Sequence, residues 1–63
     1  MNIEIIDRQD MAPRLEYLKV QYNNRVYDII IHYPLGNGKH KFYYLNGDKP
    51  KDIDFEYYIL RSL

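Results

Sequence analysis

Residues 15–33, LEYLKVQYNNRVYDIIIHY, decide the fold, because two runs of alternating apolar residues flank Asn23 and Asn24. Alternation with a period of two is typical of β-strands, since successive side chains point to opposite faces of a sheet. Asparagine tolerates the left-handed backbone that both central residues of a type I′ turn require. We therefore predict a β-hairpin with a two-residue loop.

A two-residue loop fixes which residues face each other across the hairpin. On one face, the predicted pairs are Tyr22 with Arg25, Val20 with Tyr27, Leu18 with Ile29 and Glu16 with Ile31. On the other face, they are Gln21 with Val26, Lys19 with Asp28, Tyr17 with Ile30 and Leu15 with His32. A register slipped by one residue would place Val20 opposite Asp28 and mix the faces, so the apolar pattern supports the same loop.

The second face of the hairpin is predicted to be only half polar. It carries Lys19 and Asp28 together with four apolar or aromatic residues, namely Leu15, Tyr17, Val26 and Ile30. Water would meet several apolar side chains if this face were bare. We therefore expect a helix, the N-terminal segment or another chain to cover part of it.

Two further strands are predicted outside the hairpin. Residues 2–7 alternate, with Ile3 and Ile5 on one side, and predict a short strand. The chain should turn or cross at Pro13, because proline keeps the preceding residue out of the α region. After a connection with two glycines, residues 40–45 predict a strand with apolar residues on both faces.

Residues 51–63 fit two periods, since Ile53 and Tyr57 belong both to a strand alternation and to a helical spacing. We favour a helix, with Asp52 as the N-cap, acidic residues near its start and Arg61 near its end. The predicted fold class is α+β: a small antiparallel sheet of three to four strands with a C-terminal helix. If the segment is a strand, the fold is all-β, a five-stranded SH3-like or OB-like small barrel.

Length and composition limit the class of protein. The 63 residues predict a single small domain, residues 1–63, which buries only about 60% of its unfolded surface. Nine basic and nine acidic side chains balance, unlike the charge of a dedicated duplex-DNA binder. The longest uncharged apolar run, at residues 29–31, is far too short to cross a membrane, and acidic residues near the N-terminus do not resemble a signal peptide. With no cysteine, we expect a cytoplasmic protein without membrane contact.

The sequence contains few side chains that could act as catalytic groups. It has no cysteine or threonine and a single serine, Ser62, so the usual nucleophiles are nearly absent, and we predict no enzymatic activity and no cofactor. His32 and His40, with Asp28 nearby on the hairpin, are candidate metal ligands. Because no metal-binding motif has their spacing, we predict no metal site.

A protein-binding surface is the leading functional prediction. Eight tyrosines are more than so short a chain is expected to bury, and tyrosine is enriched at interfaces. The interface candidates are Tyr17, Ile30, Tyr43 and Tyr58, which would bind a partner protein or a second copy in a homodimer. The composition, rich in Tyr, Ile, Asn, Asp and Lys, suggests a low-GC gene such as those of phages and mobile elements. An inhibitor or accessory factor from such a source is expected.

The alternative function is binding of single-stranded nucleic acid. Basic residues interleaved with aromatic ones on a strand bind phosphates and stack on bases. The candidates are Lys39, Lys41, Tyr43, Lys49 and Lys51. Acidic residues that follow cancel much of the local charge, so this function ranks second.

The order of elements over residues 22–63 loosely resembles that of KTSC-type domains. A tyrosine-ended hairpin is followed by the strand segment at residues 41–44, a proline and a tyrosine-bearing terminal segment. The lysine, threonine, serine and cysteine positions that name that family are not matched. The resemblance therefore implies no function for this chain.

Overall fold

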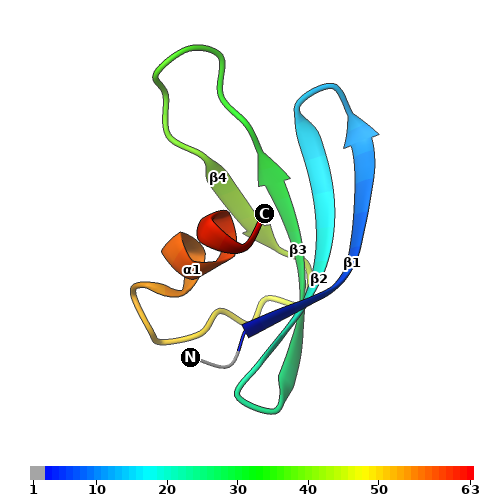
Figure 1. The fold of residues 1–63 in the computed structure, drawn as a ribbon, viewed down its shortest axis with the longest axis vertical. Helices are drawn as coiled ribbons and strands as arrows, with labels where there is room; N and C mark the ends of the chain where they lie inside the picture. Colours follow the sequence, from blue (N-terminus) through cyan, green and yellow to red (C-terminus); the bar gives the residue numbers. More distant parts are fainter. Residues whose placement is uncertain (1–2) are drawn as a thin grey trace.

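The computed structural model describes residues 3–63, in which four strands and one helix form an α+β fold. The strands form one open antiparallel sheet in the order β1-β2-β3-β4, and the helix lies across one of its faces (Figure 1). The elements are β1 (Ile3–Ala12), β2 (Leu15–Tyr22), β3 (Arg25–His32), β4 (Lys41–Tyr44) and α1 (Phe55–Ser62). The predicted class is confirmed, and the five-stranded barrel is not the fold.

The hairpin of β2 and β3 has the predicted loop and register. Asn23 and Asn24 have φ angles of 50° and 65°, the left-handed values that a type I′ turn requires. All eight predicted cross-strand pairs occur, including Val20 with Tyr27 and Leu18 with Ile29. The alternating apolar pattern and the turn chemistry therefore specify the same pairing.

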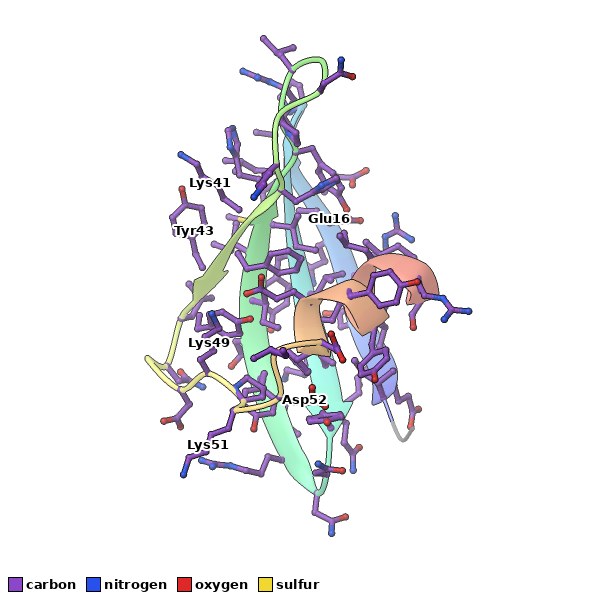
Figure 2. The ribbon with its side chains drawn as sticks, turned by 90° about the vertical axis from the view of Figure 1, so that its left-hand side faces the viewer. Glu16, Lys41, Tyr43, Lys49, Lys51 and Asp52 are labelled. Atoms are coloured by element: carbon purple, nitrogen blue, oxygen red, sulfur yellow. The ribbon has the colours of Figure 1, made fainter. Side chains whose placement is uncertain are left out.

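The hydrophobic core lies between the sheet and α1. Its buried members are Leu18, Val20, Tyr22, Tyr27, Ile29, Ile31, Phe55 and Ile59. The Phe55 ring packs against Tyr22 and Tyr27, with ring centroids 5.0 Å and 5.4 Å apart. The helix thus covers the first face of the hairpin, as Figure 2 shows from the side. We call the opposite face of the sheet the open face.

The first strand is longer than predicted. The prediction of residues 2–7 began at Asn2, which lies outside the described residues, and it ended five residues before the observed end at Ala12. Ile3 and Ile5 pair with Tyr22 and Val20, as their alternation indicated. Residues 8–12 continue the strand because they pair with β2 along its length, and two register shifts interrupt that pairing. The turn associated with Pro13 comes after this extension.

The helix begins later than predicted, at Phe55, and Asp52 is not its N-cap. The N-cap position belongs to Asp54, whose side chain makes no capping hydrogen bond. One Asp52 carboxylate oxygen accepts a hydrogen bond from the Asp54 backbone N–H at 2.9 Å, and the other accepts one from the Tyr22 hydroxyl at 2.8 Å. Asp52 therefore ties the segment before the helix to the end of β2.

The strand predicted over residues 40–45 is observed as β4, which spans only Lys41–Tyr44 and pairs with β3. Its side chains alternate as expected: Phe42 and Tyr44 pack against the core, and Lys41 and Tyr43 lie on the open face. The backbone N–H of Gly47 donates to the carbonyl of Tyr44 at 3.1 Å, and the φ of 74° at Gly47 suits glycine. This turn directs the chain from β4 toward the helix side.

Truncating the centre of the core should unfold much of the population. We expect Ile29→Ala to lower the free energy of unfolding by about 2–5 kcal/mol, because the Ile29 side chain has no exposed area and its loss leaves a cavity. Val26→Ala is the matched control on the same strand, since Val26 is 50% exposed, and its cost should stay under about 1 kcal/mol. Urea unfolding measures both, and equal costs would contradict the packing described above.

Candidate functional site

One row of side chains crosses the open face from edge to edge. Gln9 of β1 pairs with Tyr17 of β2, Tyr17 pairs with Ile30 of β3, and Ile30 pairs with Tyr43 of β4. Residues that pair directly across antiparallel strands share a face. Three of the four predicted interface residues are therefore neighbours in a single row.

The open face lacks a cover among residues 3–63. Tyr43 is 50% exposed, whereas Tyr17 and Ile30 are half-buried by their neighbours within the sheet. Figure 2 shows Lys41 and Tyr43 extending from the sheet on the side away from α1. The sequence predicted a cover for this face, but the helix lies on the other one, so the apolar row meets solvent.

A row of alternating charges runs beside the apolar row. Lys19 pairs in register with Asp7 of β1 and with Asp28 of β3, so a basic residue is flanked by an acidic residue on each neighbouring strand. The Tyr17 hydroxyl donates to the Asp28 carboxylate at 2.6 Å, and the Asn46 side chain donates to it at 3.3 Å. The hydrogen bond to Asp28 raises the pKa of the Tyr17 hydroxyl to about 12.

Tyr58, the fourth predicted interface residue, lies elsewhere. It belongs to α1 on the opposite side of the sheet and lines a hollow of about 210 Å³ with Ile3, Arg61 and Ser62. A single flat partner surface cannot cover both this hollow and the open face. The candidate interface therefore comprises Tyr17, Ile30 and Tyr43 without Tyr58.

Only some of the residues predicted to bind nucleic acid lie close to one another. Lys41 and Tyr43 lie on the same face of β4, and Figure 2 shows Lys41, Lys49 and Lys51 along the same side of the molecule. Lys39 is exposed in the preceding loop. The Lys49 ammonium lies 3.8 Å from Glu56 and 5.9 Å from the centre of the Tyr44 ring, so it is engaged on the helix side.

The two histidines have different surroundings. His32 pairs in register with Leu15 and Lys41 on the open face. The His40 ring packs edge-on against Tyr33, with the ring centroids 5.2 Å apart. Within residues 3–63, no three histidine, cysteine or acidic side chains are grouped so that they could hold a metal ion.

Sequence reasoning missed the most buried charged residue, Glu16. It is 4% exposed, and its carboxylate accepts hydrogen bonds from the Arg8 guanidinium and the Tyr33 hydroxyl. It also lines a hollow of about 410 Å³ at the β1–β2 turn, with Tyr33 and residues 10–13 and 15. The sequence does indicate that Glu16 is buried, because it alternates in phase with Leu18 and Val20 on the core face. A buried carboxylate requires partners that donate hydrogen bonds to it or neutralise its charge.

The electrostatics of this cluster favour an ionised Glu16. Burial raises the pKa of its carboxyl, but the hydrogen bonds from Arg8 and Tyr33, together with the Arg8 charge, outweigh that effect and hold the pKa below its usual value. Burial and the hydrogen bond to Glu16 raise the pKa of the Tyr33 hydroxyl to about 12. With its carboxylate satisfied by two donors, the cluster is a structural ion pair that fixes β1 to β2.

Comparisons with family models, curated proteins and solved structures find no match to this chain. In the part of the chain that the structure describes, no helix has the length and apolar character needed to span a membrane.

The Glu16 cluster predicts a specific pH dependence of stability. Because the folded-state pKa is depressed, ionised Glu16 stabilises the fold above its unfolded pKa near 4.5, and this contribution is lost as the pH falls through the folded pKa. At pH 7, Glu16→Gln should lower the free energy of unfolding by about 1–3 kcal/mol. The difference from wild type should shrink as the pH falls below about 4.5.

Urea unfolding at a series of pH values between 7 and 2.5 measures this difference. Glu4→Gln is the matched control, since Glu4 is exposed on the same strand as Arg8, and its effect should stay within about 0.5 kcal/mol throughout. A Glu16→Gln effect that stays constant or grows with acidification would contradict the assignment.

Proposed function

We propose that this chain is a small non-catalytic protein-binding module that acts by occupying a partner protein's surface with its open face. The observation that carries the proposal is the row formed by Tyr17, Ile30 and Tyr43, which crosses three adjacent strands without a cover from residues 3–63. In a domain this small, most large apolar side chains are needed for the core. A continuous aromatic and aliphatic row on the second face is consistent with a binding role.

The chemistry of the row suits a protein partner. Tyrosine contributes a large, rigid ring and tolerates a partly wet environment, which is why it is common among the residues that dominate binding energy. Half the surface of Tyr43 is available to a partner. Lys19 and Asp28 provide a polar border on one side of the row, and Lys41 and His32 provide one on the other.

The face is a better docking site than either edge of the sheet. A partner strand added to an edge needs a regular row of free backbone groups. Two register shifts interrupt β1, and β4 is only four residues long. Both features are ways in which natural sheets discourage edge pairing.

Single-stranded nucleic acid is the second candidate, favoured by the position of Lys41 beside Tyr43 on the open face. Against it, Asp7 and Asp28 lie on the same face, and the net charge is zero. If this reading holds, oligonucleotide affinity at low ionic strength should fall steeply with added salt and with Lys41→Ala. Absence of binding at low salt would remove this candidate.

Site-specific photo-crosslinking tests the protein-binding proposal. A photoreactive phenylalanine analogue is placed at Tyr43 in one sample and at Tyr57 in the other. Tyr57 is the matched control, because it is 57% exposed on the outer side of α1. After irradiation of the purified chain and of an extract of its native cells, we expect protein adducts from position 43 at several times the yield from position 57.

Competition establishes that the adduct is specific. Excess wild-type chain should suppress the adduct from position 43, whereas excess Tyr43→Asp chain should not, since a carboxylate replaces the exposed ring. Equal adduct yields from the two positions, or no adduct from position 43, would contradict the proposal.

A further inference from the structure

We infer that the partner of the open face is a second copy of this chain, packed face to face about a two-fold axis parallel to the strands. The inference rests on the proposed function and names the partner of that same surface. It is carried by the order of charges and apolar residues across the two central strands, β2 and β3, which is complementary to itself in this arrangement.

The axis determines which strands meet. A rotation about an axis parallel to the strands reverses the strand order of the second sheet. β2 then faces β3 of the second copy, and β1 faces β4 of the second copy. Two antiparallel sheets packed in this aligned way lie about 10 Å apart, with interdigitating side chains.

Residues that lie in one row of the sheet then meet across the interface. Tyr17 faces Ile30 of the second copy, so the aromatic and aliphatic centres pack on each other. In the next row, Lys19 faces Asp28 of the second copy, and Asp28 faces Lys19 of the second copy. Each of these four charges then has an opposite charge as its neighbour both within its own sheet and across the interface. On the two central strands, both the apolar pair and the charged pair are therefore matched.

The other face-to-face arrangement lacks this match. If the axis runs across the strands, each strand faces its own copy. Lys19 then faces only residues of β2, whose side chains on the open face are Leu15, Tyr17, Lys19 and Gln21. None of these is acidic, so the cation meets apolar, neutral or like-charged groups. The axis parallel to the strands is therefore the arrangement that satisfies the charges.

The available area predicts a weak dimer. Four strands about 4.8 Å apart, of ten, eight, eight and four residues at about 3.4 Å per residue, present roughly 500 Å² of projected surface per copy. This is roughly a tenth of the 4682 Å² total surface, but it is smaller than the ~800 Å² per partner of a standard interface. We expect a dissociation constant on the order of micromolar, so the mass in solution should depend on concentration.

Reversal of the two central charges tests the arrangement by analytical ultracentrifugation over a range of concentrations. Lys19→Glu alone and Asp28→Lys alone should each weaken the dimer by at least about tenfold, because each places like charges across the interface. An equimolar mixture of the two variants should recover a 1:1 dimer. In this mixed dimer, the glutamate introduced in one chain faces the lysine introduced in the other. The native Asp28 of the first chain faces the native Lys19 of the second.

A matched control and a second comparison keep the test decisive. Arg61→Glu makes the same charge reversal on α1, away from the open face, and should leave the dimer within about twofold of wild type. Circular dichroism reports whether each variant folds. If Asp28→Lys does not fold, because its bonds from Tyr17 and Asn46 are lost, the comparison of Lys19→Glu with Arg61→Glu decides the outcome.

Three results would overturn the inference: a wild-type chain that stays monomeric at millimolar concentration, a dimer unaffected by Lys19→Glu, or a mixture of two folded variants that does not dimerise. These failures differ from failure of the proposed function. A monomeric chain whose position 43 crosslinks to a different protein would refute the homodimer and retain the binding module. The absence of any adduct at position 43 would refute both.

Discussion

The left-handed backbone of Asn23 and Asn24 is the constraint on which the rest of the fold depends, because it sets the pairing of the two central strands. With a two-residue loop, Leu18 and Ile29 share the face that the helix covers, and Tyr17 and Ile30 share the other. Since the side-chain period of a strand is two, a slip of one residue would turn one strand's side chains over relative to its partner and mix the two faces. The core and the open face therefore follow from the same turn.

Hydrogen bonding to carboxylates accounts for much of the unusual tyrosine content. Four of the eight tyrosines donate their hydroxyl to a carboxylate: Tyr17 to Asp28, Tyr22 to Asp52, Tyr33 to Glu16 and Tyr44 to Glu56. Each of these rings packs within or beside the sheet, and its hydroxyl donates a hydrogen bond to a carboxylate. These tyrosines therefore add apolar contacts to those that the small core provides. Tyr43 makes no such bond among the described residues and is the exposed ring of the open face.

Much of this fold could be predicted from sequence where turn chemistry and apolar period agree. The hairpin register is the clearest case, and it also placed Tyr17 and Ile30 on the second face. Residues 8–12 were missed because they show no alternation of apolar and polar side chains, and the backbone pairing with β2 that orders them is a tertiary effect. The helix start was missed for a similar reason, since Asp52 bonds to Tyr22, thirty positions away in sequence, instead of capping the helix. Tyr58 is separated from the other interface candidates because the helix covers the opposite face of the sheet. Neither the strand period nor the helical period of the sequence indicates which face a helix will cover.

The nuclear Overhauser contacts of the Phe55 ring test the central claim most directly, because this ring marks the face that the helix covers. We expect contacts from the Phe55 ring to the rings of Tyr22 and Tyr27, whose centroids lie 5.0 Å and 5.4 Å away. We expect none to Tyr17 or Ile30. Contacts from Phe55 to Tyr17 or Ile30 would show that the helix covers the opposite face, and they would contradict the account.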